Sequence, residues 1–156
     1  MGVSTDQMVA RPCKLVRYKG GYLWRSVKRE RYKQVPINKK SAHKESPQDW
    51  ALIVRNVLIG QEGDTGSMHL RYFEISKGGY SSLEYHNHEH IVIGVRGKGT
   101  VRLANRKITL RPFDALYIAP RTIHQLSNRY DEPFGFFCIV KAKRDKPKIV
   151  SPTDIT

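Results

Sequence analysis

The sequence has little cysteine, little acidic charge and no long hydrophobic run, and each shortage excludes a class of protein. Its two cysteines, Cys13 and Cys138, lie far apart, so no disulfide-stabilised scaffold is predicted and Cys138 is expected to be a small buried side chain. The longest apolar stretch, residues 134–140, is far shorter than the roughly 18 residues that a membrane-spanning helix needs. No charged segment followed by an apolar core begins the sequence, so we expect a cytoplasmic protein without a membrane segment.

Acidic residues are half as common as basic ones. The chain has 14 Asp and Glu against 28 Lys and Arg, which gives a net charge of +14. The excess is greatest in residues 1–50, which hold 12 basic and 4 acidic residues. Such a charge attracts polyanions, but no nucleic-acid-binding motif accompanies it. We therefore favour a solvated basic surface over nucleic-acid binding.

From about residue 68 onward the residue pattern changes and indicates β-structure. Short β-branched and aromatic runs recur between turn residues, without a helical period, which is typical of an all-β sandwich or closed barrel. The expected strands are 70–75, 91–95, 100–103, 107–110, 115–118 and 134–141. We accordingly predict an N-terminal basic arm over 1–60 that packs on the barrel or on a partner subunit, a barrel over 61–145 and a C-terminal tail over 146–156.

The residues that carry chemistry are concentrated in one short segment. Residues 84–90 read Glu-Tyr-His-Asn-His-Glu-His, and imidazoles and carboxylates are ligands of transition metals. Residues two apart on a strand share a face, so Glu84 and His86 point the same way, and His90 begins the returning strand toward the same interior. The same parity admits His88, so spacing leaves the ligand set open. A His-rich surface loop is the alternative, and the apolar residues on both sides argue against it.

Two stretches of this sequence resemble the paired motifs of the cupin superfamily. In the first, Gly78 is followed after five residues by Glu84, then by His86 and His90, and six residues later by Gly97. In the second, Pro112-Phe113-Asp114 precedes His124 and then Asn128. The resemblance covers about residues 70–141. Over this range the sequence is similar to small single-domain bacterial and archaeal cupins of the conserved-barrel type.

The resemblance implies both a fold and a metal site. The fold is an all-β cupin double-stranded β-helix, a jelly-roll-like barrel, here with an N-terminal extension. One divalent transition metal (Fe, Mn, Ni, Cu or Zn) is expected on Glu84, His86, His90 and His124, with His88 as an additional ligand or a residue at the cavity mouth. The family usually has His where Glu84 stands and Glu where His90 stands, so the carboxylate has moved within the ligand set.

The resemblance also implies a range of functions. We expect a small metal-dependent enzyme that acts on a small oxygenated or anionic metabolite, with a dioxygenase slightly favoured over an isomerase or lyase. The alternative is a non-catalytic metabolite-binding or sensor cupin whose basic arm contacts a partner or a nucleic acid. A homodimer is expected because the arm is long for a bare barrel. The strands also carry residues that could line a pocket, namely Arg71, Tyr72, Glu74, Gln125, Phe136 and Cys138.

Overall fold

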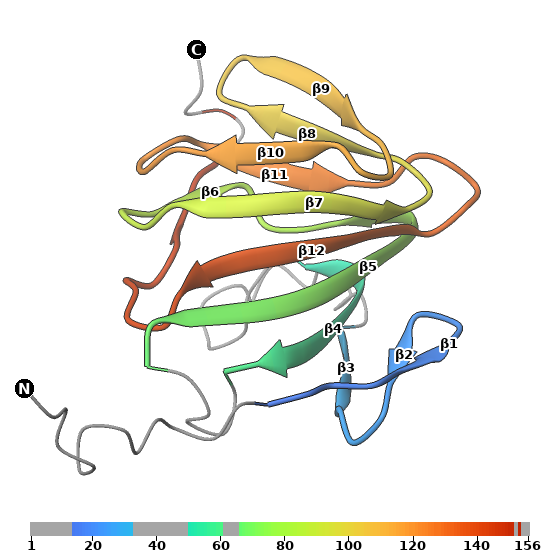
Figure 1. Cartoon of the computed structure of the whole chain (residues 1–156). Coiled ribbons are helices and arrows are strands. Elements are labelled where there is room, and N and C mark those ends of the chain that lie inside the picture. Colours follow the sequence, from blue (N-terminus) through green and yellow to red (C-terminus); the bar gives the residue numbers. More distant parts are fainter. Residues whose placement is uncertain (1–13, 33–49, 61–65, 152, 154–156) are drawn as a thin grey trace, which may run out of the picture.

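The computed structural model describes residues 14–32, 50–60, 66–151 and 153, and these form β-strands and connecting segments (Figure 1). The strands are β1 Tyr18–Gly20, β2 Leu23–Trp24, β3 Arg29–Tyr32, β4 Ala51–Ile59, β5 Met68–Tyr80, β6 Glu84–Tyr85, β7 His90–Arg96, β8 Gly99–Leu103, β9 Arg106–Leu110, β10 Ala115–Ile118, β11 His124–Ser127, β12 Phe134–Lys141 and β13 Lys148–Ile149. No α-helix occurs in this part of the chain, and none of its residues forms a helix able to cross a membrane.

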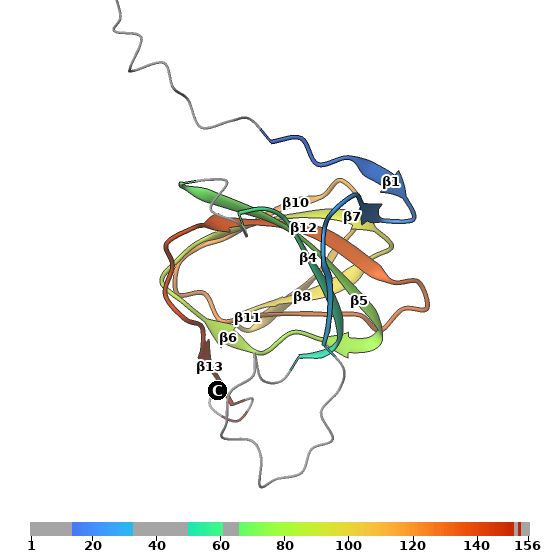
Figure 2. The same cartoon turned by 90° about the horizontal axis from the view of Figure 1, so that it is seen from below.

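The strands of the main sheet curl into a nearly closed antiparallel barrel. One side consists of β10, β7, β12, β5 and β4, and the other contains β6, β11, β8 and β9. Figure 2 looks into this barrel and shows the two groups of strands facing each other. The long strand β5 joins the two sides, since it pairs with β12 and β4 along its length and with β11 at Tyr80. The predicted all-β barrel is confirmed.

Each of the six predicted strands is present, and the sheet extends beyond the predicted barrel range of 61–145. Strand β4 pairs with β5 from the N-terminal side of this range, and β13 pairs with β6 from the C-terminal side. The sequence analysis placed Glu84 on a strand, but neither β6 nor β11 is among the six strand ranges that it predicted. Both are short, and both carry polar residues of the candidate site, so their hydrophobic alternation is weak.

The described part of the N-terminal arm packs on the barrel. Strand β3 pairs with β4, and the ring of Trp24 lies 4.9 Å from that of Tyr72 between centroids. Beneath this contact, the buried carboxylate of Glu74 accepts a hydrogen bond from the Tyr72 hydroxyl at 2.9 Å. It also lies 3.5 Å from Arg29 of the arm and 3.1 Å from Arg96 of the barrel. Because a buried carboxylate needs partners, this network fixes the arm to β5. The cysteine at position 13 and the loop over 36–48 lie outside the described residues.

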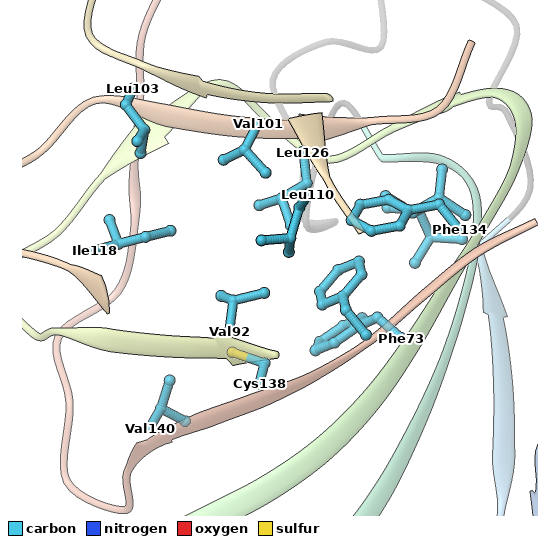
Figure 3. Close-up of a cluster of buried hydrophobic side chains, with 13 residues drawn as sticks. Phe73, Val92, Val101, Leu103, Leu110, Ile118, Leu126, Phe134, Cys138 and Val140 are labelled. Carbon is cyan, nitrogen blue, oxygen red and sulfur yellow. The ribbon is translucent and has the colours of Figure 1, made fainter. Parts of the chain in front are cut away.

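The core follows the two-residue alternation of the strands. On β12 the side chains of Phe134, Phe136, Cys138 and Val140 are all buried and point into the barrel. They meet inward-facing residues of the other strands, among them Phe73, Val92, Val101 and Leu126 (Figure 3). The inward-facing side chains of β12 are therefore aromatic rings at one end of the strand, and a thiol and a small aliphatic side chain at the other.

The strand register places polar residues at that second end. Cys138 of β12 lies opposite Arg71 of β5, and His124 of β11 lies opposite Glu84 of β6. His90 is two residues before the buried Val92 on β7 and so faces the same interior. One end of the barrel is therefore filled by hydrophobic side chains, and the other holds imidazoles, a carboxylate, a thiol and a guanidinium.

Candidate metal centre

Three imidazoles from three parts of the barrel meet in its interior. His86 follows β6, His90 begins β7 and His124 begins β11. The ring centroid of His86 lies 4.5 Å from that of His90 and 4.8 Å from that of His124. One nitrogen from each ring can be chosen so that all three lie within 4.8 Å of one another. This cluster could hold a metal ion.

Hydrogen bonds from Nδ1 to backbone carbonyl groups fix the orientation of two of these rings. The Nδ1 atom of His86 lies 2.7 Å from the carbonyl oxygen of His88, and that of His124 lies 2.8 Å from the carbonyl of Thr122. A carbonyl can only accept, so each Nδ1 carries the proton and each Nε2 presents its lone pair. Ring nitrogens of metal-bound histidines are usually oriented in this way.

His88 lies against this cluster, on the turn between β6 and β7. Its ring stacks on that of His86 at 3.6 Å, and its exposed fraction is 7%. Its Nδ1 lies 2.8 Å from Oδ1 of Asp145, and its Nε2 lies 3.2 Å from Nε2 of His90. Two ring nitrogens this close need a proton or a cation between them. His88 is therefore a buried neighbour of the three-imidazole cluster.

Glu84 brings a carboxylate close to the ring of His124. Its Oε1 lies 3.9 Å from Nε2 of His124, and its Oε2 accepts a hydrogen bond from the Ser82 hydroxyl. That hydroxyl in turn accepts a hydrogen bond of 3.1 Å from the indole nitrogen of Trp50. Burial raises the pKa of Glu84, and the Ser82 hydrogen bond and the charge of Arg71 oppose this rise. A cation beside the carboxylate would offset the cost of burying its charge.

The imidazoles of the cluster are neutral at physiological pH. Burial lowers the pKa of His86 to about 4, and the neighbouring His124 adds to the effect. Burial is also the main cause that lowers the pKa of His90 and of His124. Metal ions bind neutral imidazole, so desolvation holds these rings in the form that binds a metal.

The residues present fit a metal ion. The Nε2 atom of His86 is buried and has no hydrogen-bond partner, although a buried polar atom normally has one. Two donor atoms that share a transition metal at about 2.1 Å each lie roughly 3 to 4 Å apart. The separation of 3.9 Å between Oε1 of Glu84 and Nε2 of His124 falls in this range.

A cavity of about 480 Å³ opens beside the cluster. Glu84, His88, His90 and His124 line one part of it, and Phe73, Phe136 and Val92 form its apolar floor. Four basic residues also line it, namely Arg55, Arg71, Arg144 and Lys146. The cavity therefore combines a cluster able to bind a metal with a positively charged wall, at a size suited to a small metabolite.

Comparison with known proteins identifies the family. The family model for the cupin domain matches residues 71–140. A 1-methylthio-D-xylulose 5-phosphate methylsulfurylase from Rhodospirillum rubrum is 32% identical over 155 residues, which cover 99% of this chain and 88% of that protein. The chain belongs to the cupin superfamily. The predicted family is thus confirmed.

Solved cupin structures extend the likeness to the fold. A cupin 2 conserved barrel domain protein from Rhodopseudomonas palustris has a TM-score of 0.75 and 30% sequence identity, with 90% of this chain and 89% of that chain covered. A cupin-2 domain protein from Rhodospirillum rubrum has a TM-score of 0.70 and 31% identity, with 88% and 84% covered. The family model matches residues 71–140 alone, whereas the likeness to these two structures covers 88% and 90% of the chain.

The cupin barrel brings all five sequence-predicted site residues together, namely Glu84, His86, His88, His90 and His124. Of the other pocket candidates, Arg71, Phe136 and Cys138 line the cavity. Tyr72 and Glu74 instead form the buried network beneath the arm, and Gln125 donates a hydrogen bond to the carbonyl of Ser81.

Sequence reasoning missed the groups that surround the cluster. Asp145, Arg144 and Lys146 fall in a segment that was expected to end the barrel and begin the tail. Asp145 accepts hydrogen bonds from the backbone nitrogens of Asn87 and His88, which ties this segment to the turn before β7. Nothing in their local spacing marked these residues, because the contacts join positions more than 50 residues apart.

Proposed function

We propose that this cupin is a metal-dependent enzyme that acts on the methylthio group of a phosphorylated ketose. The relative from Rhodospirillum rubrum, which is 32% identical over nearly the whole chain, is named for such a substrate. The observation that carries the proposal is the cavity itself, whose lining includes Glu84, His90 and His124 of the candidate metal centre and four basic side chains. A ketose phosphate has oxygen ligands at one end and an anion at the other, so it matches both features.

The proposed metal ligands are Glu84, His86, His90 and His124, with His88 as a close neighbour. Three neutral imidazoles and one carboxylate leave a divalent ion with a formal charge near +1, which attracts anionic oxygens. A bound ion would supply a Lewis acid for the carbonyl and hydroxyl oxygens of the ketose. The strands and the Nδ1 hydrogen bonds hold the ligands in place before the substrate arrives.

The chain's own groups complete the cavity. Cys138 places a thiol in its wall, where Nη2 of Arg71 lies 3.3 Å from Sγ and Nδ1 of His90 lies 3.7 Å from it. The Phe73 and Phe136 rings make the floor apolar and exclude water from the reacting end of the substrate. A thioether sulfur fits such an apolar surface.

The dioxygenase preference drawn from the sequence gains no support from the relatives, since the name of the Rhodospirillum rubrum protein denotes chemistry at sulfur. The sensor alternative differs from the proposal in predicting ligand binding without turnover. The homodimer and the cytoplasmic location stay predictions.

The test is turnover of 1-methylthio-D-xylulose 5-phosphate by the full chain, followed through the methyl signal in proton NMR. The chain is first freed of metal and then loaded in turn with Fe, Mn, Ni, Cu or Zn. We expect turnover with at least one metal and none in the metal-free chain. Loss of one bound metal per chain in Glu84→Gln and His124→Gln, but not in His88→Gln, would support the ligand set. Binding of the substrate without turnover under every metal would overturn the enzyme proposal in favour of the sensor.

A further inference from the structure

We propose that Arg71, Arg144 and Lys146 form the binding site for the phosphate group of the substrate. The inference rests on the proposed function and assigns this part of the cavity wall, which we call the basic wall. All three residues line the cavity. Within the described part of the chain, no carboxylate lies within ion-pairing distance of any of them. Arg55 also lines the cavity, but it is already paired with Glu30.

Arg71 lies close to the metal cluster, because the Cys138 sulfur that it contacts also contacts His90. Its Nη2 contacts Cys138, while its Nε is buried without a hydrogen-bond partner. Its guanidinium carbon lies 5.1 Å from the centroid of the Phe73 ring, which restricts its position. A buried guanidinium donor without an acceptor is costly in a protein, and a ligand oxygen would satisfy it.

Arg144 and Lys146 are held at the mouth by the residue between them. Asp145 binds the turn at Asn87 and His88, and β13 pairs with β6 just beyond (Figure 2). The chain is therefore anchored on both sides of Lys146. Nη1 of Arg144 donates to the carbonyl of Lys141 at 2.9 Å, which fixes the guanidinium while the side chain lines the cavity.

The electrostatics of the basic wall point to an anion of more than one charge. Burial lowers the pKa of Arg144, and the charges of Arg71 and Arg55 lower it further, so these cations lie close enough to repel one another. Clustered cations of this kind are stabilised when an anion binds among them. Arginine binds phosphate through paired N–H donors, which suits a phosphate monoester better than a neutral hydroxyl.

The arrangement orients the substrate. Glu84, His90 and His124 line the cavity together with the basic wall, and Arg71 is the member of that wall beside Cys138, which contacts His90. A five-carbon ketose phosphate bound by its phosphate at the basic wall extends its carbonyl end toward the metal ligands. Phosphate binding therefore selects the phosphorylated sugar and sets which end of it reacts.

The inference is tested by titrating inorganic phosphate into the metal-free chain by calorimetry, so that no metal can bind the anion. Arg144→Gln is the main variant because the side chain lines the cavity and is exposed, and Arg71→Gln is the second. Lys107→Gln, an exposed cation on β9 outside the cavity, is the matched control. We expect binding to weaken about tenfold in each arginine variant and to remain unchanged in the control.

Equal weakening in Lys107→Gln would overturn the inference, because the effect would then be one of overall charge. Unchanged affinity in Arg144→Gln would overturn it as well. A parallel titration with xylulose 5-phosphate and xylulose should show that only the phosphorylated sugar depends on the basic wall. None of these titrations needs turnover, so the phosphate site can stand if the proposed reaction fails and can fail if the reaction is found.

Discussion

The buried imidazole of His86 should make the metal-free chain sensitive to mild acid. The pKa of His86 is lowered from its usual value to about 4 in the folded chain, chiefly by burial. The unfolded chain therefore binds more protons than the folded chain between pH 6.5 and pH 4, and the free energy of unfolding falls as the pH falls through this window. Above pH 6.5 the ring is neutral in both states and contributes nothing.

The size of this effect follows from the two pKa values. A single histidine with pKa values of about 6.5 unfolded and about 4 folded removes about 2 kcal/mol of stability between pH 7 and pH 5. Burial lowers the pKa of His90 and His124 in the same direction, whereas the raised pKa of Glu84 acts in the opposite one. Comparison with a His86→Gln variant isolates the first contribution.

Urea unfolding of both proteins at pH 5 and pH 7, without metal, measures this difference. From pH 7 to pH 5, the free energy of unfolding of the native chain should fall by about 2 kcal/mol more than that of His86→Gln. Equal losses in the native chain and in His86→Gln would refute the reasoning, because they would show that the ring of His86 is solvated or free to move.

Two further substitutions test the packing and the chemistry of the barrel. A Cβ atom at Gly99 would lie 2.0 Å from a ring atom of Phe134, so Gly99→Ala should cost about 1 to 3 kcal/mol in urea unfolding, and no loss would show that the ring can shift. Cys138→Ala should keep its metal but lower turnover, because its Sγ contacts Nη2 of Arg71 and Nδ1 of His90 and so helps to position both side chains; unchanged turnover would show that these contacts are not needed.

The sequence was sufficient to predict most of the barrel and the centre of the site. The apolar alternation around Val92 and Phe136 marked the strands, and the spacing from Glu84 to His90 placed three ligand candidates on one face. Position 88 could not be settled in this way, because parity fits a ligand as well as a turn residue. Its burial depends on Asp145, 57 positions further along the chain.

The remainder of the site arises from contacts that no local pattern encodes. Arg144 and Lys146 look like solvated charges in a polar segment, and only the pairing of β13 with β6 places them over the cavity. Trp50 likewise reads as the start of an apolar run, although its indole nitrogen binds the Ser82 hydroxyl that holds Glu84. Long-range register, rather than composition, decides which polar residues enter the site.

The carbonyl partners of His86 and His124 have a consequence for how the candidate metal centre would take up an ion. The correct tautomer of each ring is selected while the barrel folds, so the entropy of arranging the ligands is lost before any ion arrives. Preorganisation of this kind leaves the choice of occupant to the coordination preference of each ion and to its abundance in the cell.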